Sequence, residues 1–262
     1  MYIRVRDSNR AIETSRTLGL VYHLPLRQTE GFVASIFKLM GLHLHVPDHS
    51  SLSRRSKTLK IKLRAKPHLG PIDLIIDSTG LSVFGEGQWA AAKHGKRGFQ
   101  GWKKLHLGVD CNGVIVAETL TGPNVDDAKT GVKMINNERY KVKAVIGDAA
   151  YDSREIYEAA EECGARVVVP PIKNARVSRH APRARNRSVK RIEQMGRPCW
   201  KREAGYHRPG KAENAFFRYK SMIGSRLRSR DPDSQKTEVI LSCNILNRMF
   251  EHSHPKSAAP RD

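Results

Sequence analysis

The sequence contains few cysteines, few aromatic residues and no long apolar run. The four cysteines lie far apart and form no Cys-x-x-Cys pair, which argues against both a zinc site and a disulfide framework. No stretch approaches the roughly 18 uninterrupted apolar residues of a membrane span, and the first residues lack the apolar stretch of a signal peptide. We therefore expect a protein of the reducing cytosol that has no membrane partner.

Acidic residues are scarce relative to basic ones. Asp and Glu number 26 against 47 Lys and Arg, which gives a formal net charge of +21. The excess is concentrated in residues 173–230, where 18 basic residues accompany only three acidic ones. Aromatic residues are interleaved with these charges, which favours a folded surface over a disordered tail. This basic segment predicts a polyanionic partner, and we expect it to bind nucleic acid.

The N-terminal part of the chain predicts two helices. Apolar residues recur at helical spacing up to Gly41, a residue suited to the left-handed position that ends a helix. Asp48 then provides an N-cap for a second helix, whose basic face ends near Leu59. We expect residues 1–66 to form a helical, helix-turn-helix-like DNA-binding region, although ordinary helical hairpins show the same pattern. Its candidate phosphate contacts are Arg54, Arg55 and Lys57.

The middle of the chain changes to a pattern of short strands. A run rich in β-branched residues ends at Asp77, and the turn-forming residues Ser78-Thr79-Gly80 follow, so we predict a buried strand that stops there. Asn112-Gly113 separates two alternating runs and predicts a β-hairpin. A helix, a strand that ends at Asp148, a second helix and a last strand follow.

This order of elements predicts the fold class. Three strands in an antiparallel meander, followed by two strands reached through helices, describe an α/β fold with a mixed five-stranded sheet and flanking helices. This is the ribonuclease-H-like arrangement. We assign it to residues 67–250, with the basic segment 173–230 inside it, and we expect residues 251–262 to be a disordered tail.

Carboxylates follow two neighbouring strands of the predicted sheet. The right-handed crossover places the strand of Asp148 beside the strand of Asp77, so the two side chains should lie close together. Two carboxylates in an apolar sheet repel each other unless a cation lies between them. A pair of Mg²⁺ ions about 3.5–4 Å apart stabilises the attacking and leaving oxygens of phosphoryl transfer. The sequence therefore predicts a metal-dependent phosphodiester site.

A third carboxylate is expected from the helix that follows the basic segment. Glu213 lies in its first turn, and Lys220 lies two turns further along the same face, where it can hold a DNA phosphate. Each of the three acids, taken alone, also fits an ordinary strand end or helix start. Their order along the chain is what points to a shared site. The residues expected to pack this helix down are Ala212, Phe216, Tyr219 and Ile223.

Six ordered blocks containing these residues resemble the DDE transposases of bacterial insertion sequences, specifically the insertion sequence 5 family. The resemblance spans nearly the whole chain. Five of the blocks are Leu24-Pro-Leu-Arg-Gln-Thr-Glu-Gly, Pro47-Asp-His-Ser-Ser-Leu-Ser-Arg-Arg, Ile76-Asp-Ser-Thr-Gly-Leu, Trp102-Lys-Lys-Leu-His-Leu-Gly-Val-Asp and Gly147-Asp-Ala-Ala-Tyr-Asp. The sixth starts with Tyr206-His-Arg and ends with Ala212-Glu-Asn-Ala.

The resemblance implies an enzyme that hydrolyses DNA at the element's ends and lets the freed 3′-hydroxyl attack target DNA. It implies that Asp77, Asp148 and Glu213 are both catalytic residues and ligands of Mg²⁺ or Mn²⁺, with two ions. The implied partners are terminal inverted repeats and target DNA, bound by a homo-oligomer in the bacterial cytoplasm, at the nucleoid. His106 is expected to serve sheet packing rather than catalysis. The expected DNA-binding residues are Lys220, Arg208, Tyr206, Arg54, Arg55, Arg183, Arg185 and Arg187.

Two features depart from the family pattern. The family signature has Tyr, Arg, Glu and Lys at fixed spacing, and Pro209 stands at the arginine position while Arg208 is one residue away. The stretch before Leu24 is also shorter than is usual in the family, so we expect a shortened copy. Two alternatives therefore stay open: a non-catalytic DNA-binding remnant of a transposase, and a ribonuclease-H-like nuclease that performs no strand transfer.

Overall fold

The computed structural model describes residues 7–66, 70–83, 101–136, 140–206 and 210–253. The chain forms two compact units. One combines Met1–Arg64 with Asp231–Asp262, and the other is Ala65–Arg230. Within the described ranges, no helix has the length and apolar character needed to cross a membrane.

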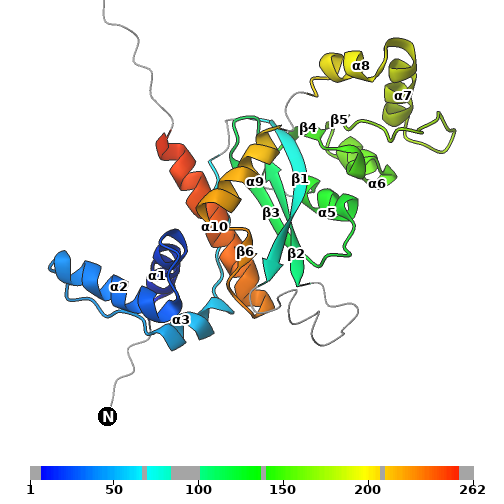
Figure 1. Cartoon of the computed structure of the whole chain (residues 1–262). Helices are drawn as coiled ribbons and strands as arrows, with labels where there is room; N and C mark the ends of the chain where they lie inside the picture. The colour runs from blue at the N-terminus through cyan, green and yellow to red at the C-terminus, as the bar shows by residue number, and fades with distance from the viewer. Residues whose placement is uncertain (1–6, 67–69, 84–100, 137–139, 207–209, 254–262) are drawn as a thin grey trace, which may run out of the picture. The chain divides into compact units, whose positions relative to one another are not determined.

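The first unit consists of helices (Figure 1). They are α1 (Asn9–Val21), α2 (Leu26–Leu39), α3 (His49–Ser56) and α10 (Pro232–Ser253). The two predicted helices are confirmed as α2 and α3, with Gly41 in the left-handed region at φ +68° and Asp48 accepting a hydrogen bond from the Ser51 N–H at 2.8 Å. Helix α1 was not expected. It contributes Ile12 to a small core with Leu52 and Leu59.

The predicted helix-turn-helix geometry is wrong for the pair α2 and α3. Their connection spans residues 40–48, whereas the turn of a helix-turn-helix has about three or four residues. Residues 42–48 of the connection are not helical, and Pro47 disfavours helical backbone at the residue that precedes it. The region is helical, as predicted, but α2 and α3 are joined by a longer connection than a helix-turn-helix has, and the short connection, residues 22–25, joins α1 to α2.

Helix α10 belongs to the first unit rather than to the predicted catalytic region. Asn244 accepts from the Arg64 N–H at 2.6 Å and donates to the Lys62 carbonyl at 3.2 Å, and Lys57 pairs with Asp231 at 3.1 Å. These contacts join segments far apart in sequence, which single-chain patterns do not reveal. Residues 251–253 form the last turn of α10, and the rest of the predicted disordered tail lies outside the described residues.

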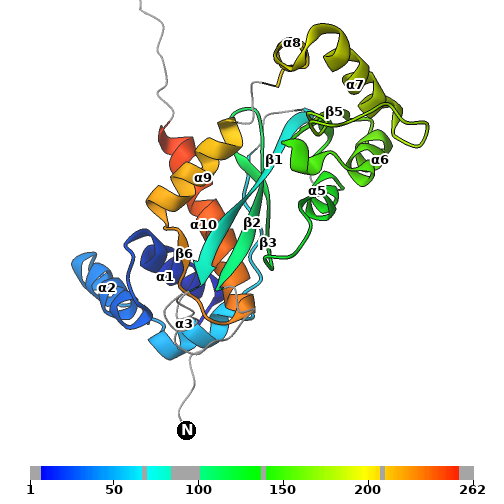
Figure 2. The ribbon, with the colours of Figure 1, turned by 45° about the vertical axis from the view of Figure 1, so that its right-hand side comes forward.

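The second unit is built on a mixed sheet (Figure 2). The strand order is β3-β2-β1-β4-β5, with β6 paired to β1. Strand β1 is antiparallel to β2 and parallel to β4, β2 is antiparallel to β3, and β4 is parallel to β5. This confirms the ribonuclease-H-like α/β fold. The strands are β1 (Ile72–Val83), β2 (Trp102–Val109), β3 (Ile115–Thr121), β4 (Val142–Ile146), β5 (Arg166–Val168) and β6 (Arg226–Leu227).

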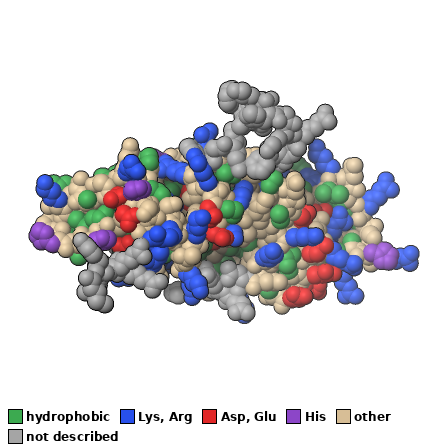
Figure 3. Space-filling view, turned by 90° about the horizontal axis from the view of Figure 1, so that it is seen from below, with side chains coloured by type: hydrophobic (Ala, Val, Ile, Leu, Met, Phe, Trp, Pro, Cys, Tyr) green, Lys and Arg blue, Asp and Glu red, His purple; other side chains and the backbone are tan. Residues whose placement is uncertain are grey.

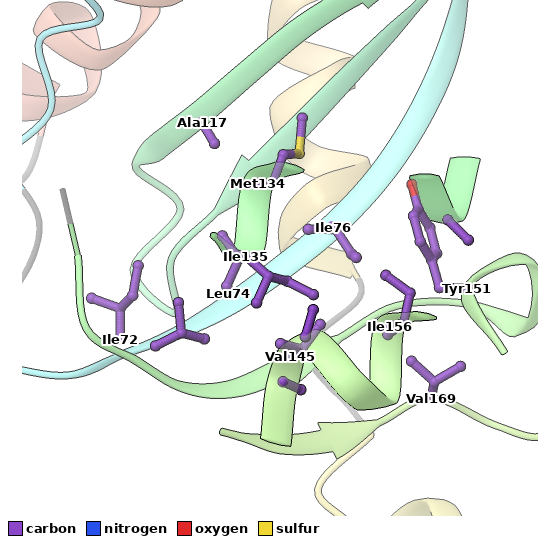
Figure 4. Close-up of a cluster of buried hydrophobic side chains, with 14 of the residues drawn as sticks. Ile72, Leu74, Ile76, Ala117, Met134, Ile135, Val145, Tyr151, Ile156 and Val169 are labelled. Atoms are coloured by element: carbon purple, nitrogen blue, oxygen red, sulfur yellow. The ribbon is translucent and has the colours of Figure 1, made fainter. Parts of the chain in front are cut away.

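Alternation along β1 separates two faces of the sheet. Ile72, Leu74 and Ile76 are buried in one core cluster with side chains of α5 (Asp127–Ile135) and α6 (Arg154–Glu162), as Figure 4 shows. Burial of each such side chain contributes about 1.5–3 kcal/mol. Because successive strand residues point to opposite faces, Asp77 and Thr79 lie on the other side.

Helix α9 (Gly210–Met222) packs against β1 and β2. Its buried side chains are Ala212, Ala215, Phe216 and Tyr219, and Ile223 just beyond it is also buried. The predicted packing stripe is therefore confirmed. Arg218 adds a hydrogen bond from its guanidinium to the Gly113 carbonyl in the β2–β3 turn, at 2.6 Å. The helix is thus held along the face that carries Asp77.

The basic segment 173–230 contains α9, β6 and two further helices that lie between β5 and α9 in sequence. They are α7 (Arg183–Met195) and α8 (Arg197–Glu203), and both views show them at the end of this unit that carries β5 and α6 (Figures 1 and 2). Trp200 on α8 is buried, as expected from aromatic residues among charges. On the face drawn in Figure 3, Lys and Arg side chains surround smaller groups of acidic ones.

Candidate active site

Strand register places the two aspartates next to each other. Ile75 on β1 pairs with Ile146 on the parallel strand β4. Asp77 and Asp148 each follow that pair by two residues, and neighbouring strands lie about 4.8 Å apart. The predicted end of the first strand was wrong, because β1 continues to Val83 and Ser78 pairs with His106 on β2. Cross-strand hydrogen bonds outweigh the turn preference of Ser78-Thr79-Gly80.

Asp77 has an unusual electrostatic environment. Burial is the main cause that raises its pKa to about 6, and the charges of Asp148, Glu213 and Asp127 raise it further. The Ser78 N–H, 2.7 Å from Oδ1 of Asp77, acts in the opposite direction. The ionised form of this carboxylate is therefore disfavoured in the free protein. A nearby cation would reverse that balance.

Asp148 lies in a turn that holds its carboxylate at the protein surface. Its Oδ1 accepts from the Ala150 N–H at 2.9 Å, which makes it the cap of the short 3₁₀ helix η1 (Ala149–Tyr151). The next residue after η1, Asp152, is the C-cap. The side chain of Asp148 is exposed, so ligands and solvent can reach it.

Glu213 comes to the same edge on α9. It lies in the first turn of that helix and is exposed, while its neighbour Ala212 is fully buried. Two turns further, Nζ of Lys220 donates to Oγ1 of Thr79 at 2.7 Å. Because Thr79 follows Asp77 on the same face of β1, this bond fixes Lys220 beside the aspartates. The predicted lysine is therefore near the carboxylates without pairing with them.

Tyr206 is the predicted site residue that precedes α9 in sequence. Burial raises the pKa of its phenol, and the charges of Asp148, Asp77 and Glu213 raise it further. Its ring stacks at an angle with Trp200, with centroids 6.4 Å apart, and Nζ of Lys201 lies 5.0 Å from its centre. Tyr206 is thus near enough for the charges of all three carboxylates to act on its phenol. Arg208 and Pro209 lie outside the described residues.

The three carboxylates suit a divalent cation by their chemistry. Among the described residues, no basic side chain forms an ion pair with Asp77, Asp148 or Glu213. The described ranges also contain no group of three or more His, Cys, Asp or Glu side chains close enough to hold one metal ion. Mg²⁺ is usually held by one or two carboxylates, with water and substrate phosphate completing its shell. The neighbouring pair Asp77 and Asp148 meets that requirement.

The opposite face of β1 carries a different polar cluster, which the sequence did not predict. Asp127 accepts from Nζ of Lys104 at 3.0 Å and from Oγ of Ser78 at 3.4 Å. His106 is buried, and its Nε2 lies 2.8 Å from Oγ1 of Thr121 and its Nδ1 3.8 Å from Asp127. Burial lowers the pKa of His106. This location agrees with the packing role expected for the histidine.

The predicted DNA-binding arginines are in unequal environments. Arg55 donates to the Asp7 carbonyl at 2.9 Å and to Asn9, whereas Arg54 is exposed. On α7, Arg183 and Arg187 are exposed, but Arg185 pairs with Asp152 at 2.8 Å. The structure therefore leaves Arg54, Arg183 and Arg187 accessible to a ligand. Arg55 and Arg185 are engaged within the protein.

Known proteins share this sequence pattern. Two family models described as transposase DDE domain match the chain, one over residues 5–86 and the other over residues 68–248. A solved structure of the simian T-cell lymphotropic virus intasome in complex with PP2A regulatory subunit B56 gamma aligns with 94% of this chain and 75% of that chain, at 12% identity and a TM-score of 0.35. That likeness is too distant to support a functional conclusion. The second family model covers well over half of the chain, and the protein therefore belongs to the DDE transposase family.

Proposed function

We propose that this protein is a transposase that cleaves DNA at the ends of an insertion sequence and joins those ends to target DNA. The observation that carries the proposal is the neighbouring pair Asp77 and Asp148, with Glu213 on α9 near enough for its charge to raise the pKa of Asp77. Among the described residues, none of the three has a basic ion-pair partner. DDE transposase domains typically use divalent metals. When bound, Mg²⁺ or Mn²⁺, as two ions, would activate the attacking oxygen and stabilise the leaving oxygen.

The protein's own residues would prepare the site for that chemistry. Asp77 and Asp148, which follow paired positions of adjacent strands, would hold a metal ion, and Glu213 in the first turn of α9 would supply a further carboxylate to the site. The Thr79 hydroxyl holds Lys220 beside them, where its ammonium group can bind a phosphate of the scissile strand. A phenol is protonated at neutral pH, and the raised pKa of Tyr206 favours that form further, so its hydroxyl can donate a hydrogen bond to a phosphate oxygen.

The finer assignment to the insertion sequence 5 family is part of this proposal. It is supported by the six sequence blocks and by the spacing of Tyr206, Glu213 and Lys220. We infer a homo-oligomer assembled on terminal inverted repeats and target DNA, since joining requires two element ends to meet one target.

A strand-transfer assay with the element's own ends tests the proposal. We expect joined products that appear only when Mg²⁺ or Mn²⁺ is present. Cleavage without joining would identify a ribonuclease-H-like nuclease, and DNA binding without either reaction would identify a non-catalytic remnant. Either result would overturn the assignment as a transposase.

A further inference from the structure

Helix α7 carries arginines in two different environments. Nε and Nη2 of Arg185 donate to the two carboxylate oxygens of Asp152 at 2.8 and 2.9 Å. The side chains of this pair are 15% and 0% exposed, respectively. Arg183 and Arg187, two residues to either side, are exposed. A buried bidentate ion pair holds two elements of a protein together, whereas exposed arginines remain available to bind a ligand.

Asp152 connects this contact to the candidate active site. It is the C-cap of η1, the short helix whose N-cap is Asp148. Besides Arg185, its carboxylate accepts from the Ile172 N–H at 3.1 Å and from the Tyr157 hydroxyl at 3.4 Å. The Arg185–Asp152 pair therefore fastens α7 to the turn that carries Asp148.

The outward side of α7 forms a basic recess. A hollow of about 480 Å³ is lined by Arg183, Asn186, Arg187 and Lys190, and none of these residues is acidic. Arg183, Arg187 and Lys190 are spaced at i, i+4 and i+7, so they form one stripe along the helix, which we call the α7 stripe. At a rise of 1.5 Å per residue the stripe is about 10 Å long, which matches roughly three base pairs of duplex.

Hydrogen bonds keep the start of this helix in place. The Asn186 amide donates to the Ser178 carbonyl at 2.7 Å, and its oxygen accepts from the Ser178 N–H at 3.1 Å. Arg154 on α6 donates to the His180 carbonyl at 3.0 Å. The loop before α7 is thus tied both to the helix itself and to the core of the unit, which gives the stripe a defined position.

We propose that the α7 stripe binds the phosphate backbone of duplex DNA, and that Arg185 is a positioning residue that docks this stripe through Asp152 and contacts no phosphate. The inference rests on the proposed function for the identity of the polyanion. It changes the role predicted for Arg185 from sequence and adds Lys190 to the DNA-binding surface. It also links DNA binding on α7 to the turn that carries Asp148.

The first test removes the stripe. The full-length variant Arg183→Gln/Arg187→Gln/Lys190→Gln is titrated with a random-sequence DNA duplex in EDTA, at several salt concentrations. We expect weaker binding and a log–log salt slope flattened by about 2–3 units, because each lost phosphate contact removes about 0.9 units. The matched control is Lys133→Gln/Lys141→Gln/Lys143→Gln, which removes the same charge from exposed positions in α5 and at the start of β4. Its slope should change by less than about 1 unit.

The second test uses two variants that change net charge in opposite directions. Asp152→Asn removes one negative charge and Arg185→Gln removes one positive charge. Docking predicts that both weaken DNA binding, by about fivefold each, and that both speed amide hydrogen exchange in α7. The double variant should bind no worse than either single variant, because both remove the same contact. A phosphate-binding Arg185 would instead make Asp152→Asn bind DNA as tightly as the parent or more tightly.

The conservative variant Arg185→Lys tests the same contact with a smaller risk that the protein fails to fold. It keeps the charge but loses the bidentate geometry, so docking predicts weaker binding and faster exchange in α7. Unchanged affinity of Arg185→Lys would overturn the positioning role. An unchanged salt slope in the stripe variant would overturn the DNA surface on α7 even if the parent binds and cleaves DNA. Failure of the parent to bind duplex DNA at all would instead contradict the proposed function.

Discussion

Carboxylates with opposite charge environments lie on the two sides of strand β1. On one face, Asp127 is compensated by Lys104 at 3.0 Å and faces the buried His106. On the other face, Asp77 lies near Asp148 and Glu213, and Lys220 donates to the neutral Thr79 instead of to any of them. The negative charge of Asp127 is thus balanced within the protein. The arrangement around Asp77 is electrostatically unfavourable until a cation arrives.

This difference teaches how a structural carboxylate can be distinguished from a metal-binding one in the same sheet. A carboxylate that serves the fold has its partner built in, since leaving a charge unpaired in a partly buried position costs stability. The group formed by Asp77, Asp148 and Glu213 lacks such a partner within the described chain. Functional sites of this kind commonly reduce the stability of the folded protein.

The largest expected difference between the two faces appears when one carboxylate on each face is neutralised. We expect Asp77→Asn and Asp148→Asn each to reduce DNA cleavage below a few per cent of the parent rate, because a metal ligand loses its charge. DNA binding in EDTA should persist. Both quantities are measured with end-labelled duplexes that carry the element's ends.

Asp127→Asn is the matched change on the other face. We expect it to retain measurable cleavage, and to destabilise the fold by about 1–3 kcal/mol because Lys104 loses its partner. Loss of cleavage as complete as in Asp77→Asn, with the fold intact, would show that the two faces do not differ in function.

The two lysines offer a smaller contrast. Lys220→Gln should slow cleavage about tenfold, which corresponds to a phosphate contact of about 1.4 kcal/mol, and should flatten the salt slope of DNA binding by about 1 unit. Lys104→Gln should leave that slope unchanged and lower the midpoint of thermal unfolding. The role of Lys220 at DNA would be refuted if both variants gave the parent slope.

The smallest expected effect concerns the pH dependence of stability in EDTA. Because the pKa of Asp77 is raised from 3.8 to about 6 in the folded protein, folding favours its protonated form. The free energy of unfolding should therefore fall as pH rises from about 4 to about 6, and Asp77→Asn should lack that fall. The shift alone corresponds to about 3 kcal/mol, and solvent screening of this partly exposed group reduces the expected gain in stability of the variant at pH 7 to about 1–2 kcal/mol.

Urea unfolding at several pH values measures this contribution, with the exposed Glu161→Gln as the control variant. The two variants should differ at pH 7 and converge near pH 4. Identical pH profiles for Asp77→Asn and the parent would show that Asp77 is not electrostatically unfavourable in the metal-free protein.

The fold was largely predictable because it depends on local patterns and on the handedness of crossovers. Alternation and Asn112-Gly113 predicted the hairpin, and a right-handed crossover sufficed to bring Asp148 beside Asp77. The length of β1 was not predictable from turn-forming residues, since its second half is held by pairing with β2. The position of α10 depends on contacts with Lys62 and Arg64, which are remote in sequence.

The site was predictable only where its residues follow strands or begin a helix. Asp148 follows β4 and Glu213 begins α9, whereas Asp77 was predictable because it ends the apolar run of β1, although the strand itself continues to Val83. The pairs Arg185–Asp152 and Lys104–Asp127 are separated by 33 and 23 positions, and nothing in the local pattern selects one partner over another. The pairing of Arg185 with Asp152 could therefore be recognised only in the structure.

Direct metal ligation by Asp148 is the most decisive point to test. Replacing it with cysteine offers a thiolate, which Mn²⁺ accepts more readily than Mg²⁺ does. The measurement is the ratio of the DNA cleavage rate in Mn²⁺ to that in Mg²⁺ for the parent, Asp148→Cys and the control Asp127→Cys. We predict that this ratio rises at least about tenfold in Asp148→Cys alone. An equal ratio in all three proteins would contradict the metal site on which the proposed function depends.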